Sequence, residues 1–267
     1  MTQWIRFNHG DRIRFGTLSG RTIEAHDGDM FGTPERSGEQ LDLGSVKILP
    51  PCLPRKMICL WNNFAANAAK QNLSRPPEPL WFLKASNAFL AHGEAIRRPA
   101  SYTGKIVYEG ELGIVIGRQC GGISEDEAAS VIFGYTCVND VTAIDLLNKD
   151  PSFAQWVRAK SFDTFGAFGP VIVTGLDPMT LNVRTVLNGV ERQNYPVNDM
   201  FFFPPARLVS LLSHDVTLMP GDVIACGTSV GVGVMSKPEN TVEISIDGIG
   251  TLSNSLTQAV PVAAPPG

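Results

Sequence analysis

Short apolar runs separated by turn residues recur along the chain, and this pattern predicts strands more often than helices. Residues 107–117 form one such run, in which two glutamates are followed almost entirely by Ile, Val, Leu and Gly. Runs of this length that are rich in β-branched residues are typical of buried strands. From residue 169 onward the pattern is β, apart from a short amphipathic helix at 206–213, and the pair Asn188-Gly189 favours a hairpin turn.

Helical signals are few and short. Residues 63–71 are rich in Ala, with Asn62 or Asn63 as the expected N-cap. Ser124 precedes three acidic residues, which is the usual start of a capped helix. The expected fold class is therefore mixed α+β, mainly β.

Prolines divide the chain near residue 50. Pro50, Pro51 and Pro54 force extended or turn geometry, because each fixes φ and disfavours helix in the residue before it. We expect a small N-terminal β subdomain at 1–54, a larger domain at 55–258 that carries the chemistry, and a flexible tail at 259–267.

Two carboxylates open the apolar run at 107–117. Glu109 and Glu111 are two positions apart, so on a strand they project from the same face. Adjacent carboxylates repel unless a cation or a shared proton compensates them, and Mg²⁺ is commonly held by one or two carboxylates. Asp140 ends a second β-rich run and supplies a third carboxylate. The alternative, a strand end with solvated acids, stays open on these residues alone.

Composition excludes several classes of function. The 267 residues are 43% hydrophobic, carry a formal charge of -4 and have no Lys/Arg run longer than two, so neither nucleic acid nor an anionic membrane is an expected partner. No apolar run is long enough to span a bilayer, and we expect a cytoplasmic protein. The five cysteines are widely spaced and lack a C-x-x-C pair, which indicates reduced thiols.

The order of the motifs resembles the fumarylacetoacetate hydrolase superfamily. They read FLK at 82–84, YEGEL at 108–112, FGYT at 133–136 with NDVT at 139–142, QWVRAKSFDTF at 155–165, PGDVI at 220–224 with GT at 227–228, and EISIDGIGTL at 243–252. The resemblance implies a fumarylacetoacetate-hydrolase-like β-roll core with short helices, usually a homodimer. It also implies Mg²⁺ or Mn²⁺ held by Glu109, Glu111 and Asp140, and a small-molecule oxo acid as substrate.

The same resemblance implies roles for further residues. Lys160 would point at the substrate as a catalytic residue, and Thr228, with Gly227, would bind a substrate oxygen. The matching motifs also make Lys84, Gln155 and Asp163 candidates for substrate contact.

The departures from the family pattern fall on the catalytic base. The His and Glu of the lid helix in similar proteins correspond here to Asn67 and Lys70, whereas a second alignment, on fumarylpyruvate hydrolases, places the His at Ala65. An Arg and a Gln that commonly follow the metal-binding Asp correspond to Ile144 and Leu147. Substrate contacts in that corner are therefore expected to differ.

The favoured hypothesis is hydrolytic C–C cleavage of an acylpyruvate such as fumarylpyruvate or maleylpyruvate, with the leaving enolate stabilised by the metal and Lys160. The missing base leaves three accounts open. Ala65 replaces a catalytic His, or Lys70 or Asp163 is the base, or the reaction needs no water. The last case corresponds to a 2-oxo acid decarboxylase or a 2-hydroxydienoate isomerase or hydratase. A non-catalytic binding protein is a further alternative.

Overall fold

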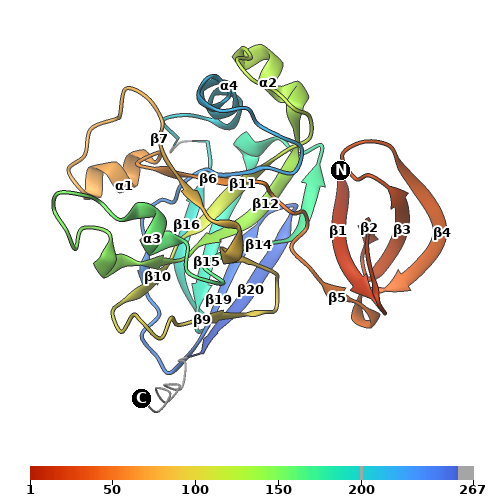
Figure 1. Ribbon diagram of the computed structural model, residues 1–267, viewed down its shortest axis with the longest axis horizontal. Coiled ribbons are helices and arrows are strands. Elements are labelled where there is room, and N and C mark those ends of the chain that lie inside the picture. The colour runs from red at the N-terminus through yellow and green to blue at the C-terminus, as the bar shows by residue number, and fades with distance from the viewer. Residues whose placement is uncertain (199–200, 258–267) are drawn as a thin grey trace, which may run out of the picture.

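The computed structural model describes residues 1–198 and 201–257. The tail predicted to be flexible, 259–267, lies outside these residues. In these described residues, twenty strands and short helices make up the fold, which is mainly β as the patterning predicts (Figure 1). The strands are β1 Thr2–His9, β2 Arg12–Ser19, β3 Thr22–Gly28, β4 Pro34–Asp42, β5 Lys47–Ile48, β6 Met57–Trp61, β7 Leu80–Lys84, β8 Phe89–Leu90, β9 Ala95–Arg97, β10 Ile106–Tyr108, β11 Gly110–Ile116, β12 Ile132–Asp140, β13 Thr142–Ala143, β14 Gly166–Thr174, β15 Asn182–Leu187, β16 Val190–Pro196, β17 Val223–Ala225, β18 Gly233–Val234, β19 Glu239–Ile246 and β20 Gly250–Thr257.

Three sheets organise these strands. The largest has the order β4-β3-β2-β1-β14-β12-β11-β17-β6-β7, a second has β16-β15-β19-β20-β9, and a third has β13-β10-β18. β1 joins the N-terminal strands to the rest of the large sheet, since Thr2 pairs with Thr174 of β14. β6 and β17 pair in parallel, with Cys59 opposite Ala225.

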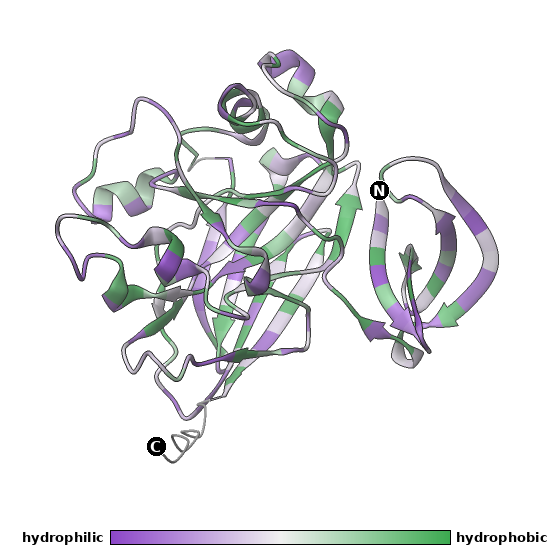
Figure 2. Ribbon diagram, in the orientation of Figure 1, coloured by the Kyte–Doolittle hydropathy of each residue, from purple (hydrophilic) through white to green (hydrophobic). Residues whose placement is uncertain are grey.

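Burial follows the hydropathy pattern of each strand. In β1, Ile5 and Phe7 are fully buried and alternate with half-buried neighbours, and Figure 2 shows the changing hydropathy as bands along the strand. In β11 all seven residues are buried, because the strand lies between β12 and β17 and is covered on both faces. The expected hairpin at Asn188-Gly189 joins β15 to β16, with both residues at positive φ.

Within the described part of the chain, four α-helices and four 3-10 helices complete the structure. They are α1 Ala65–Lys70, α2 Glu125–Val131, α3 Trp156–Lys160 and α4 Pro205–Asp215, with η1 Leu43–Ser45, η2 Ser86–Ala88, η3 Ile144–Leu146 and η4 Pro178–Thr180. α2 begins with the expected capping box, in which Ser124 and Glu127 satisfy each other's backbone N–H groups. Among residues 1–198 and 201–257, every helix is too short or too polar to cross a membrane.

The start of α1 corrects one expectation. The helix begins at Ala65, and Phe64 is its N-cap, without a side-chain cap. Asn63 is unavailable for capping because its amide donates to the carbonyls of Phe203 and Cys226 and accepts from the Phe203 N–H. Asn63 therefore ties three distant segments together beside the cavity described below.

Candidate metal centre

Two neighbouring strands deliver the carboxylates. Glu109 lies at the break between β10 and β11, and its N–H donates to the side-chain oxygen of Asn139 at 3.1 Å. The N–H of Asp140 donates to the Glu109 carbonyl at 2.9 Å. These bonds fix the end of β12 against the Glu109 segment, so Glu109, Glu111 and Asp140 meet although 28 residues or more separate Asp140 from the glutamates in sequence.

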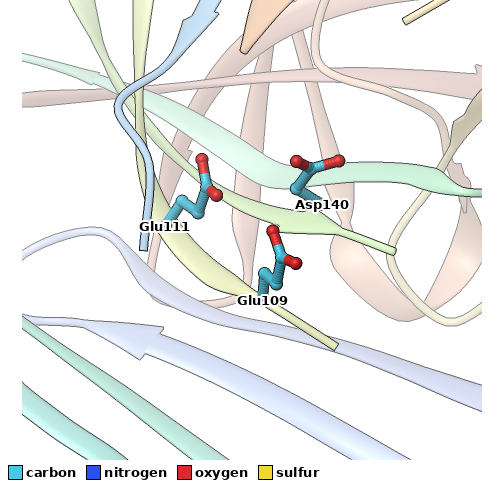
Figure 3. A group of neighbouring side chains, drawn as sticks. All are labelled: Glu109, Glu111 and Asp140. Carbon is cyan, nitrogen blue, oxygen red and sulfur yellow. The ribbon is translucent and has the colours of Figure 1, made fainter. Parts of the chain in front are cut away.

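The three carboxylates form a cluster. One oxygen from each of Glu109, Glu111 and Asp140 lies within 4.8 Å of the others, and Figure 3 shows the groups turned toward a common point. Glu111 is fully buried and Asp140 is 1% exposed. Burial, followed by the nearby Asp140 and Glu109 charges, raises the pKa of Glu111 well above its usual value. Burial also raises the pKa of Glu109, although Lys160 partly offsets this.

A hard divalent cation fits this donor set. The Oε2 atom of Glu111 accepts the Gly227 N–H at 2.9 Å, whereas its Oε1 atom is buried without a hydrogen-bond partner among the described residues. A buried carboxylate oxygen without a partner is costly unless it is protonated or coordinates a cation. Mg²⁺ and Mn²⁺ both prefer oxygen ligands of this kind.

Lys160, at the end of α3, faces the same cluster. Its Nζ donates to Glu109 Oε2 and to Asp140 Oδ2, each at 2.6 Å. Burial acts to lower the pKa of Lys160, but the two carboxylates outweigh it and the pKa is raised. The same balance applies to Asp140, where burial opposes the effect of Lys160 and Lys84, and its pKa is lowered.

Close packing requires a glycine at position 110, between the two glutamates. A Cβ on Gly110 would lie 2.1 Å from the Thr185 hydroxyl and 3.2 Å from the Gln193 side-chain oxygen. The face of the strand opposite the carboxylates thus packs directly on β15 and β16, and a side chain at position 110 would displace the cluster.

A cavity of about 140 Å³ opens beside the cluster and is partly lined by Glu109, Lys160 and Thr228. The Thr228 hydroxyl donates to the Gly110 carbonyl at 2.9 Å and accepts from Gln193 at 2.8 Å. Gly227 positions Glu111 through its N–H.

Several other predicted site residues do not line this cavity. They include Ala65, Lys70, Gln155 and Asp163. Ala65 and Asn67 lie about 200° apart around a helix, so α1 presents Asn67 to the cavity and turns position 65 away. The exposed Asp163 accepts a bond from Asn87 at 2.7 Å beside a different cavity. The backbone of Gln155 caps α3, accepting the Ala159 N–H.

Lys84 lies behind Asp140, not in the cavity. Its side chain is fully buried, with Nζ 2.6 Å from Asp140 Oδ1 and hydrogen bonds to the carbonyls of Val141, Lys160 and Phe165.

Sequence reasoning missed several residues that line the cavity, including Trp61, Asn62 and Gln71. Asn62 adopts a left-handed conformation, with φ 54°, and its Nδ2 donates to the Ser74 carbonyl. Its Oδ1 atom is buried and has no hydrogen-bond partner within the described chain. One sequence signal pointed to a special backbone conformation at Asn62, namely the Asn62-Asn63 pair directly after a strand. Asn tolerates the left-handed conformation better than most residues.

Comparisons with known proteins identify the family to which most of the chain is similar. Residues 56–257 match the family described as fumarylacetoacetate (FAA) hydrolase C-terminal, and residues 2–51 match Rv2993c-like, N-terminal. The oxaloacetate tautomerase YisK of Bacillus subtilis is 36% identical over 80% of this chain and 74% of its own.

Two solved structures have the same fold. A 2-hydroxyhepta-2,4-diene-1,7-dioate isomerase from Mycobacterium marinum superposes with a TM-score of 0.87 at 35% identity, covering 97% of this chain and 99% of that one. Fumarylpyruvate hydrolase from Pseudomonas aeruginosa, in complex with Mn²⁺ and pyruvate, has a TM-score of 0.71 at 28% identity, covering 77% and 91%. With the family match over most of its length, this chain belongs to the fumarylacetoacetate hydrolase family.

Proposed function

We propose that the protein is a divalent-metal-dependent enzyme that interconverts the keto and enol forms of a small 2-oxo acid. One observation carries the proposal. Glu109 of the cluster and Lys160 both line the cavity, and among the described residues its lining contains no imidazole and no second carboxylate. The four histidines lie elsewhere: His9 in β1, His26 in β3, His92 before β9 and His214 in α4. Such a site suits proton transfer better than the activation of water.

Glu109, Glu111 and Asp140 would hold Mg²⁺ or Mn²⁺. When bound, the ion would polarise the carboxylate and keto oxygens of a 2-oxo acid and so acidify its C3 hydrogens. The relative named as an oxaloacetate tautomerase and the neighbour named as a diene isomerase support this class of reaction.

Lys160 is the proposed proton carrier. Conversion of enol to keto requires one proton at C3 and releases one from the enol oxygen, so no water is consumed. The Lys160 ammonium group gives a proton to C3, and the resulting amine recovers the proton released by the enol. Asn62 lines the cavity, and its Oδ1 atom is buried without a partner in the described chain; this oxygen would accept a hydrogen bond from the enol hydroxyl when substrate is bound.

Hydrolysis of an acylpyruvate is the second candidate. The likeness to a fumarylpyruvate hydrolase with bound Mn²⁺ and pyruvate favours it. That reaction needs an activated water, and α1 presents Asn67 rather than a base to the cavity. Incubation with fumarylpyruvate separates the candidates, because hydrolysis yields fumarate and pyruvate. Decarboxylation of oxaloacetate would instead be detected as CO₂.

The direct test is deuterium exchange at C3 of 2-oxo acids in D₂O, followed by NMR with the Mg²⁺-loaded protein. We expect enzyme-dependent exchange that falls about 10²- to 10⁴-fold in Lys160→Met. The exposed Lys149→Met is the matched control and should exchange like the wild type. Exchange no faster than with Mg²⁺ alone, or equal rates for both variants, would overturn the proposal.

A further inference from the structure

Most of the cavity wall carries no charge. Of the lining residues, five are apolar, namely Leu60, Trp61, Phe82, Ile144 and Val232, and four are neutral and polar, namely Asn62, Asn67, Gln71 and Thr228. In the part of the chain that the structure describes, Glu109 and Lys160 are the only ionisable lining residues. The wall therefore contrasts with the acidic cluster beside it.

Lys160, the one cationic side chain that lines the cavity within residues 1–198 and 201–257, is already engaged. Lys160 donates to Glu109 and Asp140, and its Nζ lies 5.2 Å from the centre of the Phe82 ring. When a 2-oxo acid places its own carboxylate and keto oxygen at the cluster, a second carboxylate at the other end of the molecule finds no separate counter-ion among the described lining residues. A desolvated carboxylate without a counter-ion is strongly unfavourable.

An aromatic groove adjoins the cavity. It has a volume of about 480 Å³, and Trp61 and Phe82 line both spaces. Trp61 pairs with Leu80, and Cys59 with Phe82, so Trp61, Leu80 and Phe82 lie on one face of the β6–β7 pair. Trp156 of α3 packs on that face, with its ring 5.1 Å from that of Trp61 and stacked on Phe82 at 5.3 Å.

We infer that the substrate is a 2-oxo acid whose distal arm is uncharged and apolar, branched aliphatic or aromatic, and that the enzyme discriminates against dicarboxylates. The arm contacts Ile144, Trp61 and Phe82 and extends into the aromatic groove. This inference rests on the proposed function and specifies its substrate class.

A pair of substrates of equal shape tests the preference. Oxaloacetate and 4-methyl-2-oxopentanoate share the 2-oxo acid head, and two methyl groups in the latter replace the two oxygens of the distal carboxylate. We expect kcat/KM for C3 exchange to be at least about tenfold higher for 4-methyl-2-oxopentanoate and for phenylpyruvate than for oxaloacetate. An equal or higher value for oxaloacetate would overturn the inference and leave the proposed function intact.

Substitutions in the wall should reverse or reduce the preference. Ile144→Arg supplies the missing counter-ion, so it should raise kcat/KM for oxaloacetate relative to 4-methyl-2-oxopentanoate. Val157→Arg, on α3 and 51% exposed, adds the same charge outside the cavity and should leave the ratio unchanged. Trp61→Ala should lower kcat/KM for phenylpyruvate more than for pyruvate, which has no arm. Ratios unchanged in both Ile144→Arg and Trp61→Ala would contradict the assignment.

Binding decides the inference if catalysis fails. Absence of exchange with every acid would refute the proposed function but would leave the inferred substrate class to be tested by binding. The Kd values of 5-methyl-2-oxohexanoate and 2-oxoglutarate, another pair of equal shape, would then be compared by calorimetry on the Mg²⁺-loaded protein. Tighter binding of 5-methyl-2-oxohexanoate by at least about tenfold supports an apolar subsite. Equal or tighter binding of 2-oxoglutarate refutes it.

Discussion

The Lys84 ammonium and the Asp140 carboxylate lie 2.6 Å apart with both side chains shielded from solvent. Lys160 approaches the other Asp140 oxygen, also at 2.6 Å. Asp140 is thus held between two lysines, of which Lys160 lines the cavity and Lys84 does not. We therefore predict separable roles for the two lysines, Lys160 in the proposed chemistry and Lys84 in positioning Asp140.

Lys84→Met should destabilise the protein by about 3–5 kcal/mol, because it removes one partner of a buried ion pair and three hydrogen bonds to carbonyls. Urea unfolding measures the change. Lys237→Met, at an exposed position, is the control and should unfold like the wild type. Equal stability of the two variants would show that the pair contributes little.

Glu111→Gln should weaken Mg²⁺ or Mn²⁺ binding by about a hundredfold or more, since it removes a buried carboxylate from the proposed ligand set. Calorimetry gives the Kd, and the metal-dependent rise in Tm should vanish with it. Glu78→Gln changes an exposed carboxylate and should retain metal binding. Tight binding by Glu111→Gln would exclude this cluster as the metal site.

Gly110→Ala should destabilise the fold by about 1–3 kcal/mol, because the added Cβ would overlap the Thr185 hydroxyl. Thr185→Ala removes that hydroxyl, so the double variant should recover part of the loss in a double-mutant cycle. Strictly additive effects in urea unfolding would place the strain elsewhere.

His92 should make stability depend on pH. Burial lowers the pKa of His92 below its usual value, and its Nδ1 accepts the Ser253 N–H at 3.1 Å. Since the folded-state pKa is the lower one, the stabilising contribution is present above about pH 6.5 and is lost as the pH falls through the folded-state value. Between pH 7 and 5, the urea midpoint of His92→Gln should therefore decline less than that of the wild type. Parallel pH profiles would contradict this.

Local patterning predicted most of the elements. The apolar run at 107–117, the Asn188-Gly189 turn and the Ser124 cap each specify structure through neighbouring residues, and the structure contains all three. The start of α1 was wrong because Asn63 is bonded to segments about 140 and 163 residues away. Local sequence carries no information on such contacts.

The candidate site could likewise be predicted only as far as local spacing and the family resemblance allow, without its long-range contacts. The spacing of Glu109 and Glu111 placed two carboxylates together, and the resemblance to a family added Asp140 and Lys160. The neutral wall could not be foreseen, since Trp61, Ile144 and Val232 meet there only through the tertiary fold. The sequence alignments likewise could not decide between positions 65 and 67, which the helical phase of α1 separates.

The parallel pairing of β6 with β17 has a consequence for synthesis on the ribosome. The strand that carries Trp61 leaves the ribosome more than 160 residues before its partner strand, so it remains unpaired on that side for most of translation. The acidic residues of the cluster likewise emerge before Lys160, and Thr228 emerges later still. A nascent chain therefore cannot close the cavity before Val232 has emerged, and loading of the proposed metal with Gly227 bonded to Glu111 is expected to follow synthesis of that segment.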